Sequence, residues 1–191
     1  MCTLYNIKVT PEDLLAAFDA EDSLRGAVTK DYVSPGGAGP VVGRRDGKRR
    51  LAVLRWGFPP PDGARAPVVN VRNYASPFWR ATLADPRRRC LVPATEFSEW
   101  SARREGAKQV LHWFSIPSRP IFAFAGIWRP TETGPAFAFL TCEPNPLVGA
   151  IHPKAMPVIL AEEDHDRWLG GTFEEACALA TAYPSQLMAM T

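Results

Sequence analysis

The hydrophobic positions of this 191-residue chain fall into many short runs rather than a few long ones. Six runs rich in β-branched or aromatic residues, bounded by proline and glycine, predict strands. They span residues 51–56, 90–92, 110–116, 121–128, 136–141 and 158–160. Only Pro117-Ser118-Arg119-Pro120 separates the third run from the fourth. This short connection predicts that residues 110–116 and 121–128 form an antiparallel pair.

Local start and stop signals predict four helices. Thr10 can cap the first helix, with Pro11 at its first position and two acidic residues in its first turn. The second helix begins at Ser76-Pro77 and ends before Pro86, because proline cannot continue a helix. The other two helices span residues 163–169, closed by Gly170-Gly171, and residues 174–182.

This pattern predicts one α+β domain over residues 1–191, with a strongly bent, mostly antiparallel, barrel-like sheet and peripheral helices. The 19 prolines are spread from Pro11 to Pro184, which favours many short elements over two domains and a linker. The most apolar run, residues 120–128, is much shorter than the roughly 18 residues of a membrane helix. No basic segment followed by an apolar block opens the chain, so we expect a cytoplasmic protein without membrane contact.

The four cysteines predict free thiols. Cys2, Cys90, Cys142 and Cys177 lie 88, 52 and 35 positions apart, without the C-x-x-C pairs of a zinc site. Their number is also too small for a disulfide scaffold in a chain of this length. We therefore expect neither a disulfide nor a metal or other cofactor.

The net charge of +2 conceals a basic middle segment. Residues 40–110 carry 15 Lys and Arg against 6 Asp and Glu, whereas the rest of the chain carries 7 against 14. The basic clusters are Arg44-Arg45, Lys48-Arg49-Arg50, Arg87-Arg88-Arg89 and Arg103-Arg104, and aromatic residues such as Trp56 and Trp100 are interleaved with them. This mixture suits single-stranded nucleic acid, since cations bind phosphates and aromatic rings stack on bases. A solvated basic surface beside core aromatics is the alternative.

Cys2 is the first candidate for chemistry. Removal of the initiator methionine before so small a residue would leave a free 1,2-aminothiol. An α-amine has a pKa of roughly 7.7–8.0, so a useful fraction is neutral and nucleophilic at neutral pH. Such an amine condenses with an aldehyde to an imine, and the thiol can then close a thiazolidine ring. This chemistry requires an exposed Cys2; the alternative is a small residue at an unconstrained terminus.

Three further segments carry candidate side chains. His152 lies between Ile151 and Pro153 in a proline-rich loop that can aim an imidazole for proton transfer. Glu99 lies between aromatic residues, whose apolar surroundings raise a carboxyl pKa. Asn70 and Arg72 share a face if their segment is extended, and can hold a sugar oxygen and a phosphate. The alternatives are a structural histidine, an exposed carboxylate and a polar turn.

Several blocks, taken in order, resemble the SRAP family, the SOS-response-associated peptidase-like or abasic-site processing proteins. The blocks are Met1-Cys2, Leu54 to Pro60, Asn70-Val71-Arg72, Arg89 to Ala94 leading to Phe97-Ser98-Glu99-Trp100, Phe124 to Trp128, Thr141 to Asn145, Ile151-His152, and Met156 to Leu160. The resemblance extends from residue 2 to about residue 180.

The resemblance implies a protein that binds single-stranded DNA, or the strand at a single-strand/double-strand junction. It implies that Cys2 crosslinks to the ring-opened aldehyde of an abasic site through a thiazolidine, with possible lyase or peptidase activity and an association with the nucleoid during DNA damage. The implied chemical residues are Cys2, Asn70, Glu99 and His152. The implied DNA contacts are Arg72 and Arg80 to phosphates, Trp56, Trp100 and Pro35 beside the missing base, and Thr141 and Lys154. A monomer without a cofactor is expected.

The sequence departs from the family pattern at three places. Leu4 stands where the family often has an arginine near its start, Lys154 lies in a histidine loop that is one residue longer than usual, and Asn73-Tyr74-Ala75 follows Arg72 in place of the common residues. Two alternative functions are open: a hydrolase of amides or peptides with Cys2 as its N-terminal nucleophile, and a non-covalent single-strand binding module in which Cys2 has no role.

Overall fold

The structure is a computed structural model and describes residues 2–23, 30–60, 66–101 and 108–191. The predicted Met1 removal and the Arg103-Arg104 cluster lie outside these residues. The strands are β1 (Tyr5–Asn6), β2 (Ala20–Asp22), β3 (Tyr32–Val33), β4 (Ala38–Arg45), β5 (Lys48–Trp56), β6 (Asn70–Val71), β7 (Arg89–Ala94), β8 (Glu96–Trp100), β9 (Leu111–Ser115), β10 (Phe122–Arg129), β11 (Ala136–Cys142), β12 (Met156–Pro157), β13 (Ile159–Leu160) and β14 (Ala189–Met190). The α-helices are α1 (Pro11–Phe18), α2 (Pro77–Ala84), α3 (Pro146–Gly149), α4 (His165–Gly170) and α5 (Phe173–Ala178).

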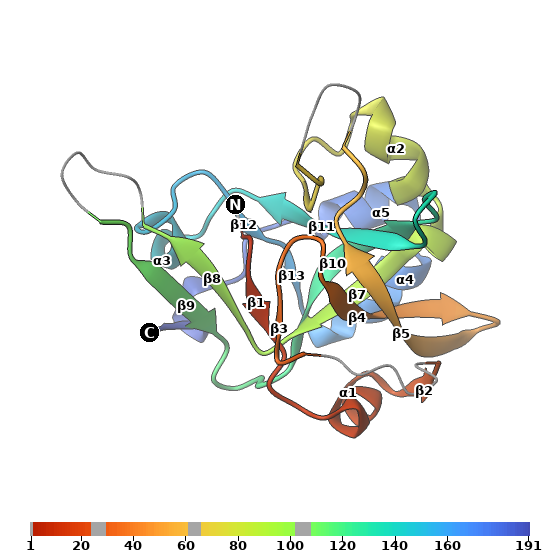
Figure 1. Cartoon of the computed structure of the whole chain (residues 1–191), viewed down its shortest axis with the longest axis horizontal. Coiled ribbons are helices and arrows are strands. Elements are labelled where there is room, and N and C mark those ends of the chain that lie inside the picture. The colour runs from red at the N-terminus through yellow and green to blue at the C-terminus, as the bar shows by residue number, and fades with distance from the viewer. Residues whose placement is uncertain (1, 24–29, 61–65, 102–107) are drawn as a thin grey trace.

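Two sheets organise these strands (Figure 1). The smaller sheet has the order β14-β9-β8-β1-β3, and the larger has the order β12-β11-β10-β7-β4-β5-β2. An additional pairing of β11 with β5 brings the larger sheet partly round on itself. Most pairings are antiparallel, while β5 with β2, β11 with β5 and β11 with β6 are parallel. The predicted α+β fold with a bent, mostly antiparallel, barrel-like sheet is confirmed.

The predicted pairing of residues 110–116 with 121–128 is wrong. β9 pairs with β8 and β14 in the smaller sheet, whereas β10 pairs with β7, β11 and β13 in the larger sheet. The connection between them therefore carries the chain from one sheet to the other. The ring of Phe114 in β9 stacks on Phe97 of β8, with 5.1 Å between centroids, so this strand is held by its non-local neighbour.

Helix boundaries follow the predicted local signals. Thr10 and Asp13 form a capping box at the start of α1, and α2 begins at Pro77. The third predicted helix contains a 3₁₀ turn, Glu162–Asp164, followed by α4, and the fourth is the shorter α5. In the described part of the chain, no helix combines the length and apolar character needed to cross a membrane.

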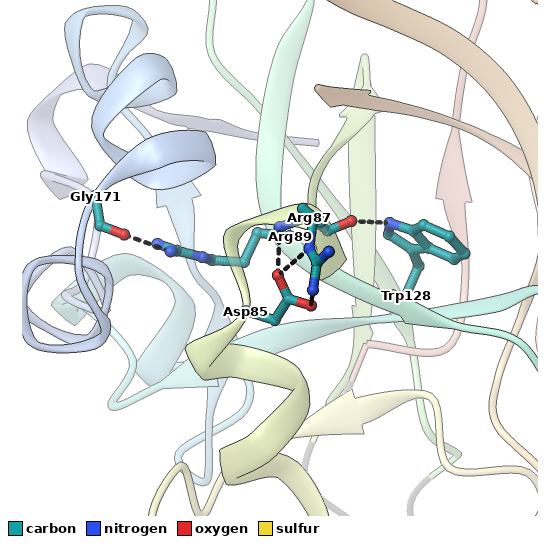
Figure 2. Close-up of polar contacts among 5 residues, drawn as sticks. All are labelled: Asp85, Arg87, Arg89, Trp128 and Gly171. Atoms are coloured by element: carbon teal, nitrogen blue, oxygen red, sulfur yellow. Dashed lines mark hydrogen bonds and ion pairs between the residues drawn. The ribbon is translucent and has the colours of Figure 1, made fainter. Parts of the chain in front are cut away.

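Arg89 fixes α4 and α5 to the sheet. Its side chain is fully buried, and its guanidinium donates to the carbonyl oxygen of Gly171 (Figure 2). It also donates to the Thr172 carbonyl oxygen over 3.4 Å. The indole Nε1 of Trp168 donates to the Cys90 carbonyl oxygen over 2.9 Å. Arg89 thus belongs to the fold and, unlike most of the basic middle segment, contributes neither to a nucleic-acid surface nor to a solvated basic one.

The core between the two sheets is aromatic. The Tyr5 ring meets Trp56 and Phe124 edge-on, with centroids 5.1 and 5.7 Å apart. Trp56 stacks on Phe139 at 5.1 Å, is completely buried, and donates from Nε1 to the Val69 carbonyl oxygen over 3.0 Å. The prediction that Trp56 forms a surface beside a missing base is therefore wrong. Its indole is enclosed in the core, and its N–H already has a hydrogen-bond acceptor.

Candidate active site around Cys2

Cys2 is held against β8 by the strand that follows it. β1 pairs with β8, and the Leu4 carbonyl oxygen accepts from both the backbone N–H and the hydroxyl of Ser98, each over 3.0 Å. The Cys2 thiol donates to the same carbonyl oxygen over 3.5 Å and is completely buried. The expectation of an exposed Cys2 is therefore wrong for the thiol, because the segment packs along the strand.

Asn70 contacts Cys2 directly. β6 pairs with β11 and presents Asn70 next to the N-terminal segment, where its Nδ2 donates to the Cys2 carbonyl oxygen over 3.0 Å. The other amide atom, Oδ1, is buried and has no hydrogen-bond partner among the residues that the structure describes. A buried acceptor left open is costly, so Asn70 offers a place for a donor such as a hydroxyl or an amine.

Glu99 and His152 complete the cluster. Their carboxylate Oε2 and imidazole Nδ1 lie 3.8 Å apart, at ion-pair distance. Glu99 lies on β8 and is 2% exposed, and burial raises its pKa to about 7. Burial lowers the pKa of His152, and the charge of Lys154 acts in the same direction. Glu99 can therefore exchange protons near neutral pH.

The histidine loop is fixed by the short helix α3. The Asn145 side chain accepts from the Val148 backbone N–H over 2.9 Å, which caps this helix. The backbone N–H of His152 donates to the Val148 carbonyl oxygen over 2.8 Å. The imidazole is thus aimed by hydrogen bonds as well as by the neighbouring proline. We call Cys2, Asn70, Glu99 and His152 the Cys2 site.

The Cys2 thiol itself is held in its protonated form. Burial raises its pKa well above the ordinary value for a thiol, and the carboxylate of Glu99 raises it further. Within the described residues, no group of three or more His, Cys, Asp or Glu side chains could hold a metal ion. The Cys2 site itself supplies a backbone nitrogen, a thiol, a carboxyl and an imidazole.

The predicted DNA contacts divide into surface and interior positions. Trp100 is 47% exposed, and Pro35, Arg80 and Lys154 are also exposed. Arg80 lies on α2 with its guanidinium 4.6 Å from the centroid of the Phe173 ring. Thr141 is completely buried, and its hydroxyl donates to the Val71 carbonyl oxygen over 3.3 Å. The prediction of a DNA contact through the Thr141 side chain is therefore wrong.

Arg72, two residues after Asn70 of the Cys2 site, contacts the end of β11. Its guanidinium donates to the Cys142 carbonyl oxygen over 2.6 Å and forms an ion pair with Glu143. The Tyr74 hydroxyl donates to the Thr141 carbonyl oxygen beside it. Sequence reasoning gave no role to Glu143, Tyr74 or Ser98. In the sequence, the ion pair of Arg72 was indicated only by the acidic Glu143 directly after Cys142.

The fold and the site define an α+β protein with a candidate cysteine centre next to its N-terminus. The sequence model of the SOS response associated peptidase (SRAP) family matches residues 1–191, and the chain belongs to this family. It is 28% identical over 183 residues to the abasic site processing protein YoaM of Bacillus subtilis, covering 88% of this chain and 79% of that protein. It is 29% identical over 183 residues to the abasic site processing protein YoqW of the same organism, covering 88% and 80%.

Two solved structures share the fold. A protein from Bacteroides thetaiotaomicron superposes with a TM-score of 0.83 at 22% identity, over 99% of this chain and 90% of that one. A protein from Bordetella bronchiseptica gives a TM-score of 0.81 at 22% identity, over 100% and 98%. At this identity the likeness concerns the fold alone.

Proposed function

We propose that this protein processes abasic sites in single-stranded DNA, or at single-strand/double-strand junctions, by crosslinking Cys2 to the ring-opened sugar aldehyde. The observation that carries the proposal is the convergence of Asn70, Glu99 and His152 on Cys2, from four separate parts of the chain. The names of the relatives YoaM and YoqW, which describe abasic site processing, support the same substrate.

The proposed reaction begins with removal of Met1, which converts the amide nitrogen of Cys2 into a primary amine. This amine attacks the aldehyde carbon to give a carbinolamine. Protonation of the carbinolamine hydroxyl by Glu99 or His152 releases water and leaves an imine. The Cys2 sulfur then adds to the imine carbon while the thiol proton passes to the nitrogen, and the thiazolidine ring closes. Removal of Met1 consumes one water and releases methionine, and the steps from the free amine to the thiazolidine release one water.

The geometry supports separate tasks for the neighbouring side chains. Asn70 already holds the Cys2 carbonyl and has a buried oxygen open to a sugar hydroxyl. Glu99, with a pKa raised to about 7 by burial, can donate a proton at neutral pH and accept it again. Arg72, Arg80 and Lys154 supply positive charge for neighbouring phosphates, and the exposed Trp100 offers a face for a flanking base.

The hydrolase alternative has less support from the site. An N-terminal cysteine hydrolase attacks its substrate with the thiolate. Both burial and the neighbouring Glu99 raise the pKa of the Cys2 thiol, so they disfavour that form. Chemistry that starts at the nitrogen uses the thiol only in its second step, and agrees better with these surroundings.

Intact mass spectrometry of the untagged protein, with and without an abasic oligonucleotide, tests the proposal. The expected spectrum shows loss of Met1 and a heat-resistant adduct whose mass is that of protein plus DNA minus one water. Cys2→Ala abolishes the adduct, and Cys2→Ser leaves at most a weaker one, since oxygen closes the ring less readily. The matched control Cys177→Ala keeps full adduct formation. An unchanged adduct in Cys2→Ala would reject the proposal.

A further inference from the structure

A cavity of about 290 Å³ opens in the larger sheet between β4, β5, β7 and β10. Its walls are apolar and include Val41, Ala52 and Leu54. It is hollow because small residues meet there: Gly43 of β4 pairs with Cys90 of β7, and a Cβ added at Gly43 would meet no atom within 4 Å. None of the lining residues belongs to the Cys2 site. A concave site with mostly apolar walls and a few polar groups is the usual form of a small-ligand site.

Trp128 contributes a fixed aromatic wall to this cavity. Its indole Nε1 donates to the Arg87 carbonyl oxygen over 3.1 Å, as Figure 2 shows. The Arg88 guanidinium lies 4.6 Å from the centroid of the indole ring. Trp128 is only half-buried although two contacts hold it in place. A half-exposed and immobilised indole is a suitable surface for stacking a planar ring.

Arginine side chains surround the mouth of the cavity. Arg44, Arg45, Arg50 and Arg87 all line it. The Nε atoms of Arg44 and Arg50 are buried and have no hydrogen-bond partner among the described residues. The side chains of Arg45 and Arg87 are 81% and 87% exposed and can reorient toward a ligand.

The positive charge here exceeds the negative charge that offsets it. The basic side chains that line the cavity are Arg44, Arg45, Arg50 and Arg87; Lys48 and Arg49 are their neighbours on β5, and Arg88 follows Arg87. In the ion pairs of the described residues they share the carboxylates of Glu21, Asp46, Asp85 and Asp166. Asp166 and Glu21 each serve two of these cations, so the surface keeps a cationic excess that can bind an anion.

An apolar slot with an aromatic wall and a cationic rim matches a ligand that is planar at one end and anionic at the other. We propose that this cavity binds one nucleotide, with its base against Trp128 and its phosphate on the arginine rim. The volume lies just below the roughly 300–1,000 Å³ of small-molecule pockets, which suits one nucleotide rather than two. The ligand is a free mononucleotide or one unit of a single strand. The proposal goes beyond the chemistry assigned to Cys2 and does not depend on it.

Gly43 provides the sharpest test. Gly43→Leu fills the slot without a backbone clash, because its Cβ points into open space and its φ is not positive. Gly43→Ala is the matched control that leaves most of the slot open. Calorimetric titration with dTMP is expected to show binding to the wild type, at least tenfold weaker binding to Gly43→Leu, and less than a threefold change for Gly43→Ala. Thermal unfolding checks that all three chains are folded.

Two further variants address the charged end of the site. Arg45→Glu combined with Arg87→Glu changes only exposed side chains and is expected to weaken dTMP binding at least tenfold. Arg167→Glu, a half-exposed arginine outside the cavity, is the control and leaves binding unchanged. Inorganic phosphate is expected to bind far more weakly than dTMP. Equal affinity for both probes would overturn the base-binding role of the slot.

An intact oligo(dT) distinguishes the two sources of the nucleotide. If Gly43→Leu weakens oligo(dT) binding but dTMP alone does not bind, the ligand is a unit of the strand. If dTMP binds in the slot and oligo(dT) is unaffected by the substitution, the ligand is a free mononucleotide. The proposal fails if neither probe responds to Gly43→Leu, or if an oligoglutamate peptide competes for the slot as well as dTMP does. Adduct formation at Cys2 is measured separately, so each proposal can fail without affecting the test of the other.

Discussion

At the scale of single residues, burial in the Cys2 site disfavours the charged forms of its ionisable groups. Glu99 is the clearest case, because its carboxyl is almost completely enclosed and its pKa is raised to about 7. In an unfolded chain the same group titrates at roughly 4.3. The folded protein therefore binds more protons than the unfolded one between these values, and this group makes stability fall as the pH rises through that window.

Glu99→Gln is accordingly expected to stabilise the fold at pH 8. Glutamine is neutral at every pH, so it removes the cost of a buried carboxylate, whereas at pH 5 the wild-type carboxyl is already protonated and the gain shrinks. Thermal unfolding of both chains at pH 5 and 8 measures this difference. The same variant loses adduct formation by at least tenfold if Glu99 transfers protons. An equal stability difference at both pH values would contradict the raised pKa.

His165 gives the opposite dependence, away from the Cys2 site. Burial, helped by the charges of Arg119 and Arg49, lowers its pKa to about 4. Since the unfolded chain takes up its proton near pH 6.5, stability is lost as the pH falls from 6.5 toward 4. His165→Gln is expected to lose less stability over this range, by up to about 3 kcal/mol. Urea unfolding at several pH values measures it, and parallel curves for the two chains would refute the assignment.

At the scale of elements, local signals were readable from the sequence and non-local pairings were not. Caps and prolines predicted where α1 and α2 begin, because those interactions span only a few residues. The partners of β9 were not read in this way: β14 lies at the far end of the chain, and β8, the strand directly before β9, was not among the predicted strands. β4 was missed as well: its glycines and Pro40 conceal a strand that is paired on both sides.

The hairpin of β4 and β5 depends on its two-residue turn. Asp46 and Gly47 both have positive φ, at 53° and 77°, as the preferred tight turn of a hairpin requires. Gly47→Ala is expected to destabilise the protein by about 1 kcal/mol, because a side chain disfavours this conformation. Gly43→Ala in the neighbouring strand is the control and changes stability little, since its φ is ordinary and its surroundings are open. Chemical denaturation compares the two, and equal effects would contradict the turn argument.

At the scale of the whole molecule, the basic middle segment contributes less free positive charge than its composition indicates. Arg89 is buried, while Arg72 and Arg87 are paired with carboxylates. The sequence could predict the charge excess and the four members of the Cys2 site. It could not predict the distant ion pairs, such as Arg72 with Glu143 or Arg44 and Arg49 with Asp166 of α4, because these partners are far apart in the sequence.

This distribution predicts a shallow salt dependence for binding to intact single-stranded DNA. Each phosphate contact contributes a slope of about 0.7 in a plot of log affinity against log salt. Arg80→Ala is expected to reduce the slope by about that amount and to weaken binding to intact and abasic strands alike. Arg167→Ala is a control on a different helix. Fluorescence anisotropy at several salt concentrations measures the slope, and an unchanged value for Arg80→Ala would remove Arg80 from the interface.

The three hydrogen bonds accepted by the Leu4 carbonyl oxygen also fix how many residues can lie between Cys2 and Leu4. They fix the alignment of the first residues with β8, and successive residues of an extended chain point to opposite sides. Inserting one residue between Cys2 and Leu4 would turn the sulfur away from Asn70 and Glu99, and deleting one would do the same. The number of residues between Cys2 and β1 is therefore as necessary to the Cys2 site as its side chains are.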